Sequence, residues 1–327
     1  MTNIQTQYAG LKLRNPIIAG SSGLTGKPEK NREFEKTGAA AIVLKSLFEE
    51  QIEMQGQVLL RETDYPEAAD YLYQYVKANQ VNNYLDLIKA TKDCCSIPVI
   101  ASINCYKADA WIEFSRQIEI AGADALELNL FRLETSLTEP DGYERSMNIY
   151  ADIIRKVKET VHIPVIAKIG KYFNNIPAMA NTLKANGADA IVLFNRFYQP
   201  DIDINSRQIV SGNVFSNHSD ISDTLRWTAI VSGMIPGINI AASTGIQEWE
   251  DVVKCLLAGA SAVQICSALY THGAEIITQL LSGLEEWMQH ANFQSIPQFK
   301  GTLNYANIKD PAIYERAQFM KYLSGRD

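Results

Sequence analysis

The chain has 327 residues, of which 46% are hydrophobic, and a formal net charge of −7. This charge, without any block of basic residues, argues against a surface that binds nucleic acid or anionic membranes, and no run of eighteen apolar residues predicts a membrane span. The length suffices for one large core, so we expect a single domain over residues 1–327.

Eight short apolar runs follow one another along the chain, separated by segments long enough for helices. They cover residues 15–19, 41–44, 99–103, 125–128, 165–167, 190–194, 238–242 and 262–265. Continuous apolar runs are typical of parallel strands that are covered on both faces. Glycines that suit a helix end recur just before four of these runs, at Gly38, Gly122, Gly187 and Gly259. The alternation predicts an α/β fold, a (β/α)8 TIM barrel.

The segments between the runs have helical periodicity, most clearly over residues 109–121, 143–161 and 248–258. Two connections are too long for simple loops. They are residues 49–79, after the second predicted strand, and residues 196–222, after the sixth. We expect insertions that act as lids or substrate walls, with an oligomer contact or surface decoration as the alternative.

Polar residues follow the apolar run at the end of each predicted strand. Because the carboxyl ends of barrel strands converge on the face that carries the active site, we expect these residues to meet there. The candidate binding residues are Ser21, Ser22, Lys45, Ser46, Asn104, Asn129, Lys168, Asn195, Ser243, Thr244, Gly245, Cys266 and Ser267.

Two lysines and three asparagines stand out within this set. Lys45 and Lys168 need a partner at the barrel mouth, which is either an anionic or electron-accepting ligand or a carboxylate such as Glu127. The asparagine amides suit a planar heterocycle with C=O and N–H edges, although a loop-capping role is the alternative for any one of them.

Short polar turns follow the last two predicted strands, where barrels commonly bind phosphate. They contain Ser243, Thr244 and Gly245 in the first turn and Cys266 and Ser267 in the second. We expect Gly245 to permit a close approach of the backbone to a phosphate. A flat hydrogen-bonding ring, two cations and a phosphate tether together favour flavin mononucleotide (FMN) as the cofactor.

Over most of its length the chain resembles the dihydroorotate dehydrogenase family of FMN barrels. The matching segments are residues 15–16, 21–23, 44–46, 127–129, 167–169, 195, 244–246 and 264–269. The resemblance implies an oxidoreductase of pyrimidine metabolism in which Lys168 stabilises the reduced flavin and Lys45 lies near flavin and substrate. It also implies ring and substrate contacts for Asn129 and Asn195, and phosphate contacts at Gly245 and Ser267.

The chain departs from the family pattern at two places. The family has a Cys or Ser base shortly after the fourth strand, but here Arg132 lies in that stretch and the first hydroxyls are those of Thr135 and Ser136. The family also has an asparagine-rich loop after the second strand, which residues 63–68 lack. Both departures concern the substrate, so the chain resembles a divergent, dihydroorotate dehydrogenase-like branch.

Three functions are compatible with these patterns. The first is an FMN oxidoreductase that transfers hydride between flavin and a small ring or C=C substrate, with Arg132 recognising an anion and Ser136 or a tyrosine relaying a proton. Dihydroorotate is a possible substrate if Ser136 acts as the base, but we expect it to reduce the flavin slowly or not at all. The second is an FMN-binding protein without small-substrate catalysis, in electron transfer or as a scaffold. The third is a Schiff-base aldolase using Lys168.

The remaining expectations concern location, metals and partners. Five cysteines without C-x-x-C spacing and four scattered histidines predict reduced thiols and no metal site. An N-terminus without a signal-peptide pattern favours a cytoplasmic protein. Since it also lacks the membrane-associating extension of the quinone-linked branch, we expect a soluble electron acceptor. The family implies a homodimer.

Overall fold

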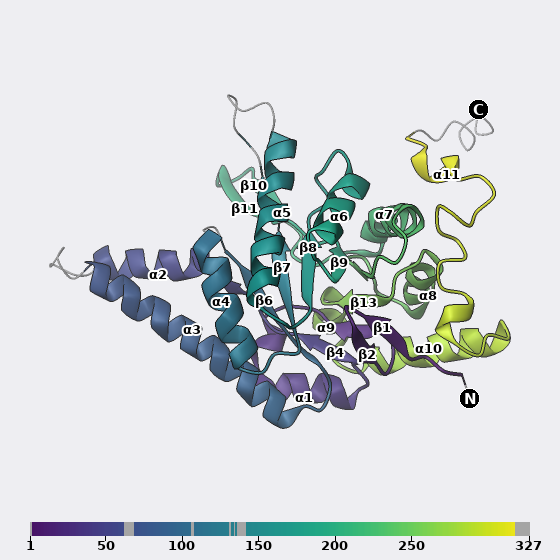
Figure 1. The fold of residues 1–327 in the computed structure, drawn as a ribbon, viewed down its shortest axis with the longest axis horizontal. Helices are drawn as coiled ribbons and strands as arrows, with labels where there is room; N and C mark the ends of the chain where they lie inside the picture. Colours follow the sequence, from purple (N-terminus) through teal and green to yellow (C-terminus); the bar gives the residue numbers. More distant parts are fainter. Residues whose placement is uncertain are drawn as a thin grey trace.

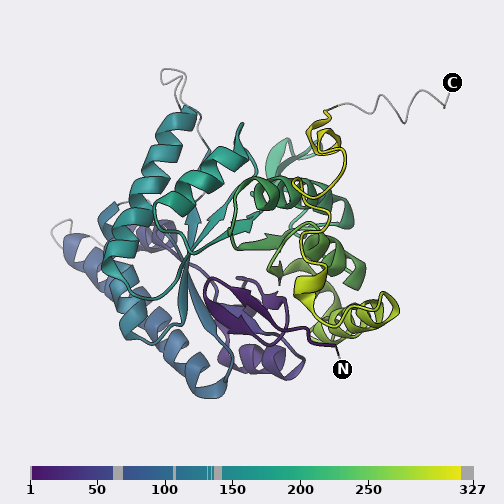
Figure 2. The ribbon, with the colours of Figure 1, turned by 45° about the vertical axis from the view of Figure 1, so that its right-hand side comes forward.

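The computed structural model describes residues 2–61, 69–105, 108–130, 132–133, 135 and 142–317. Parallel strands form a closed barrel with helices around it (Figures 1 and 2). The eight barrel strands are β3 (Ile17–Ala19), β4 (Ala41–Val43), β6 (Val99–Asn104), β7 (Ala125–Leu130), β8 (Val165–Ile169), β9 (Ala190–Leu193), β12 (Ile240–Ser243) and β13 (Ala262–Ile265). Each corresponds to one predicted run, so the predicted (β/α)8 barrel is confirmed.

The barrel closes because β3 pairs with both β4 and β13, and every neighbouring pair of barrel strands is parallel. Ile18, for example, lies opposite Gln264 on one side and Ala41 on the other. The strands are almost entirely buried, which explains why they appear in the sequence as continuous apolar runs rather than alternating ones.

Helices follow the barrel strands and cover the outside of the barrel (Figure 2). They are α1 (Pro28–Lys36), α3 (Ala69–Cys94), α4 (Ala108–Ile120), α5 (Gly142–Thr160), α6 (Ile176–Ala185), α7 (Ile221–Met234), α8 (Trp249–Leu257) and α10 (Ile276–His290). Shorter elements are η1 (Leu24–Gly26), β5 (Leu47–Phe48), α9 (Ser267–His272), η4 (Ile296–Gln298) and α11 (Ala312–Glu315).

A hairpin closes the N-terminal end of the barrel. Its strands β1 (Thr6–Tyr8) and β2 (Leu11–Leu13) pair antiparallel. The fully buried Tyr8 packs in one cluster with interior residues such as Ile18 and Ile100. This end of the barrel is therefore a packed floor, and the opposite end is the mouth.

Both predicted insertions are present. Helix α2 (Glu49–Arg61) and the long α3 pack side by side and extend beyond the barrel wall in Figure 1. The second insertion forms the antiparallel hairpin of β10 (Pro200–Asp203) and β11 (Gln208–Ser211), followed by η3 (His218–Asp220).

No helix in the described part of the chain is long and apolar enough to cross a membrane. The same residues contain no group of three or more His, Cys, Asp or Glu side chains arranged to hold a metal ion. All five cysteines are free thiols.

Candidate active site

The strand ends bring the candidate binding residues to the barrel mouth. Asn104, Asn129, Lys168 and Ser243 belong to the last two residues of β6, β7, β8 and β12. The others directly follow β3, β4, β9, β12 and β13. Ser22 has a local task, because its Oγ accepts a hydrogen bond from Leu24 N and so closes the turn after β3.

A hydroxyl and amide network links the strand ends across the mouth. Ser46 Oγ lies 3.0 Å from Ser21 Oγ and 2.8 Å from Ser102 Oγ. Asn129 Nδ2 donates to Ser46 Oγ at 2.8 Å and to Ser102 Oγ at 3.1 Å, while its Oδ1 accepts from Asn195 Nδ2 at 3.3 Å. Asn129 is only 4% exposed. The Asn129 amide thus finds its hydrogen-bond partners within the protein, and it positions the neighbouring side chains.

The other two asparagines keep an acceptor available. Asn104 Nδ2 donates to Asn129 O at 3.0 Å. Within the described residues no donor reaches Oδ1 of Asn104 or of Asn195, and both side chains are partly exposed. A ligand with N–H groups would find its acceptors here.

Lys168 lies in a buried polar cluster inside the mouth. Its Nζ donates to Gln264 Oε1 at 3.1 Å and lies 3.4 Å from Glu127 Oε1. Gln264 Nε2 in turn donates to Glu127 Oε2 at 2.6 Å. The carboxylate partner considered from the sequence is therefore present. An ammonium has three donors, so Lys168 can still donate to a ligand.

The two turns after β12 and β13 line a cavity of about 130 Å³, which Lys168 and Asn195 also reach. Thr244 and Gly245 have left-handed backbones, with φ of 82° and 85°. Across the described chain, the N–H groups of Gly245 and Ile246 have no acceptor. These are the donors that a phosphate requires.

Gly245 has a packing role that the sequence does not show. A Cβ at this position would lie 2.2 Å from Ile221 N and 2.6 Å from Ile221 Cα. Hence the start of α7 excludes a side chain here. The glycine is required by packing and by its positive φ.

The second insertion covers the turn after β13. Ser267 Oγ accepts from Ser216 N at 2.9 Å and lies 3.0 Å from Ser216 Oγ. Gln247 Nε2 donates to Ser216 O at 3.0 Å. Ser216, which sequence reasoning missed, thus lies over the turn after β13, and no sequence motif marks it.

Burial raises the pKa of the Cys266 thiol, although nearby Lys168 opposes this shift. A thiol with a raised pKa is a poor nucleophile at neutral pH. Cys266 therefore contributes shape to the mouth rather than covalent chemistry.

A second cavity, of about 170 Å³, adjoins the first on the side of the first insertion. Ser46 lines it, and its Oγ lies 3.0 Å from that of Ser21, which lines the first cavity. Lys45 lies here, exposed and without an ion pair to any described residue, whereas Lys168 lines the first cavity. Four amides of α2 and α3 also line it, together with Tyr84; the amides are Gln51, Gln55, Gln80 and Asn83.

Tyr84 attaches the insertion to the barrel at this cavity. Its hydroxyl accepts from Ser102 N at 2.7 Å and donates to Ser102 O at 2.9 Å. Burial raises the pKa of Tyr84, and the charge of Glu127 adds to the effect. Sequence reasoning missed Tyr84 and the four amides because they lie on helices whose position against the mouth has no local signal.

The two candidate catalytic residues are not assembled into a site by the described chain. Arg132 is exposed just beyond β7. Ser136 lies outside the described residues, as do residues 63–68 of the first insertion. Their predicted roles stay predictions.

Comparison with known proteins points to one protein family. A family model described as "Dihydroorotate dehydrogenase" matches residues 3–288. A Thermoplasma volcanium protein named "Dihydroorotate dehydrogenase B (NAD(+)), catalytic subunit" is 32% identical, over 92% of this chain and 98% of that protein. Proteins of the same name from Thermoplasma acidophilum and Methanosarcina acetivorans are 31% and 28% identical, over 92% and 89% of this chain and 99% and 93% of their own.

Proposed function

Because the chain belongs to the dihydroorotate dehydrogenase family, we propose that it is an FMN-dependent oxidoreductase that acts on the CH–CH bond of a small ring substrate. The observation that carries this proposal is the buried Lys168 beside two turns with free backbone donors. A cation and an anion-binding backbone at one mouth fit a flavin ring and its phosphate.

The residues at the mouth match FMN group by group. Gly245, Ile246 and the turn at Ser267 would hold the phosphate, while Asn104 and Asn195 would accept from ring N–H groups. Lys168 would donate to the ring. When bound, FMN supplies the centre that takes up a hydride from the substrate and passes the electrons to an acceptor.

Glu127 and Gln264 fix the Lys168 ammonium in position. Glu127 is fully buried, so its charge requires the ammonium nearby, and the two side chains hold Nζ at one point. A positioned cation stabilises negative charge on the reduced ring without reorganisation.

The second cavity is the proposed substrate side. Lys45 offers a cation for an anionic substrate, and amides from α2 and α3 offer the donors and acceptors that the loop after β4 lacks. Gln80 Nε2 donates to Gln55 Oε1 at 2.8 Å, so the two insertion helices present these amides together.

The choice of substrate depends on which residue accepts the proton. Of the described residues just beyond β7, only Thr135 carries a hydroxyl, and none carries a thiol. General-base assistance is worth about 10² to 10⁴ in rate. We therefore propose slow oxidation of dihydroorotate, the substrate named for the relatives, and a preferred ring substrate with a more acidic C–H bond.

Anaerobic stopped-flow reduction tests this proposal. Saturating dihydroorotate should bleach the flavin band well below an ordinary turnover rate of about 1 to 10³ per second. Bleaching within that range would refute the proposed substrate preference, and Ser136→Ala would then identify the base. Absence of bleaching by dihydroorotate and by other cyclic CH–CH donors would favour the electron-transfer or scaffold function.

The proposal also covers the electron acceptor and the oligomeric state. The relatives' names give NAD(+) as acceptor for those proteins. For this chain we propose a soluble acceptor, and a homodimer as in the family. Return of the flavin band on mixing the photoreduced protein with candidate acceptors identifies the acceptor. Sedimentation equilibrium tests the homodimer.

A further inference from the structure

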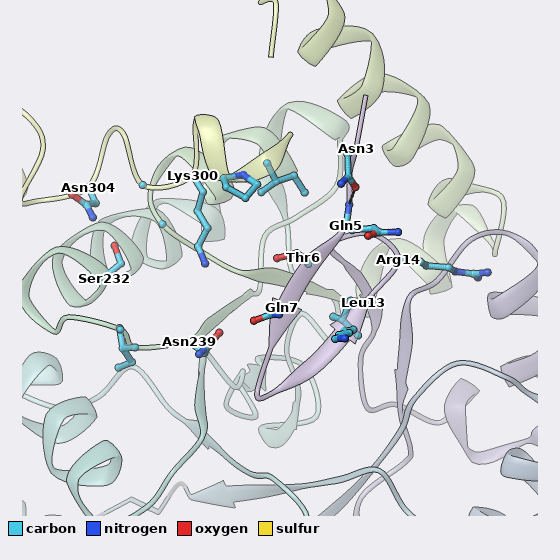
Figure 3. A pocket seen from close by; sticks show the side chains of 17 residues that line it. Asn3, Gln5, Thr6, Gln7, Leu13, Arg14, Ser232, Asn239, Lys300 and Asn304 are labelled. Carbon is cyan, nitrogen blue, oxygen red and sulfur yellow. Dashed lines mark hydrogen bonds between the residues drawn. The ribbon is translucent and has the colours of Figure 1, made fainter. Parts of the chain in front are cut away.

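A large cavity of about 1050 Å³ lies at the floor of the barrel, opposite the mouth (Figure 3). Its walls come from the β1–β2 hairpin, from the segment before β12 and from residues 296–304 after α10. Small-molecule sites commonly have volumes of about 300 to 1,000 Å³, so this cavity has the size of a metabolite site.

The lining of the floor cavity is cationic and polar. Lys12, Arg14 and Lys300 contribute to it, and none of its described lining residues is Asp or Glu. This composition is unusual in a chain whose net charge is −7. Arg14 is already engaged, since its guanidinium donates to Glu35 O and Ala39 O. Lys12 and Lys300 thus remain available to a ligand, and of these two only Lys300 is partly buried.

Lys300 is a partly buried ammonium without a counter-charge. Its Nζ donates to Ser261 Oγ at 2.6 Å, and it forms no ion pair with any residue that the structure describes. Burial lowers the pKa of Lys300, an effect that a bound anion would oppose. Two of its three donors remain for a ligand.

Uncharged donors surround the same space. Asn239 Oδ1 accepts from Ser261 Oγ at 3.3 Å, while its Nδ2 meets no acceptor within the described chain. In the view of Figure 3, Gln7 and Asn239 lie below the Lys300 ammonium. Ser232 lies to its left, but its hydroxyl already donates to Ala258 O at 2.7 Å. Amide donors around one cation, with no carboxylate among the described lining residues, form the arrangement that binds an oxyanion.

The floor cavity is separate from the flavin mouth. Asn239 and Gly259 precede β12 and β13, whereas the phosphate turns follow these strands. The buried Tyr8 of the floor hairpin lies between the two ends. We propose that the floor cavity binds a small metabolite through its phosphate or carboxylate group, with Lys300 as the anchoring cation and Asn239 and Gln7 as neutral donors.

Calorimetric titration with two probes tests this proposal on the full chain saturated with FMN. Pyrophosphate and citrate represent the two oxyanion classes, and we expect saturable binding of at least one, which identifies the class. Lys300→Gln should weaken that binding at least about tenfold. Gln7→Leu should weaken it less, and it leaves the contact between Lys300 and Ser261 intact.

Two control variants separate this site from other effects. Lys89→Gln removes a lysine charge from α3, where Lys89 is exposed and pairs with Asp86 at 3.5 Å, and should not change binding. Ser267→Ala alters only the mouth and should not change it either. The proposal is overturned if neither anion binds at millimolar concentration, if Lys300→Gln and Gln7→Leu both bind like wild type, or if Ser267→Ala abolishes binding.

Discussion

The two halves of the barrel mouth are formed by different groups, backbone turns in one and side chains in the other. On the β12–β13 side, backbone turns at Thr244, Gly245 and Ser267 form the candidate phosphate site. On the β4–β6 side, side chains of two inserted helices line the cavity at Lys45. The first half depends on backbone geometry and matches the family pattern, whereas the second depends on tertiary placement and departs from it. If the first half binds FMN as proposed, substrate choice can change while that site is kept.

Of the variants that test the two halves, Gly245→Ala should have the largest effect. Its Cβ would meet the backbone of Ile221 at 2.2 Å, a contact that no side-chain rotation relieves. We expect a loss of stability of several kcal/mol, from about 1 to 2 kcal/mol for the left-handed backbone and about 1 to 3 kcal/mol or more for overpacking. Urea unfolding measures the loss of stability, and FMN content measures the effect on the candidate phosphate site.

Gly122→Ala is the matched control. Gly122 also has a positive φ, 93°, but a Cβ there would meet nothing within 4 Å. It should show only the backbone cost of about 1 to 2 kcal/mol. Equal stability of the two variants would mean that the contact with α7 does not constrain the phosphate turn.

Lys168→Met tests the cation of the half that contains the candidate phosphate site. It leaves the buried Glu127 carboxylate without its cation, so we expect a loss of about 3 to 5 kcal/mol. The double variant Lys168→Met with Glu127→Gln should recover most of that stability. The flavin reduction potential should be lowered in both, because both lack the cation. A potential restored in the double variant would contradict a direct role of Lys168 at the ring.

Tyr84→Phe tests how the inserted helices support the substrate half. It leaves the N–H and C=O of Ser102 without their buried partner, at a cost of about 1 to 3 kcal/mol. Thermal unfolding measures the loss. Tyr75→Phe on the same helix is the control, since Tyr75 is 60% exposed, and it should be nearly neutral. Similar melting temperatures for both variants would show that α3 is held elsewhere.

Lys45→Gln should have the smallest effect on stability, within about 0.5 kcal/mol, because the side chain is exposed. We expect unchanged FMN content and a raised KM for an anionic substrate. Lys36→Gln, an exposed lysine at the end of α1, controls for the change in net charge. A reduced FMN content in Lys45→Gln alone would move Lys45 to the cofactor half.

The sequence predicts the barrel and the position of its polar strand ends because both depend on local patterns. Buried parallel strands appear as apolar runs, and their carboxyl ends must converge. The sequence does not show that Gly245 packs against Ile221, or that Ser216 lies over Ser267, because these contacts join elements that only the fold brings together. The same holds for Tyr84 and the amides of the inserted helices.

Flavin content of the purified protein tests the central claim most directly. We expect one FMN to be released per chain on denaturation, because Lys168 and the turns after β12 and β13 line one cavity at the mouth. Absence of released flavin, even after expression with added FMN, would contradict it.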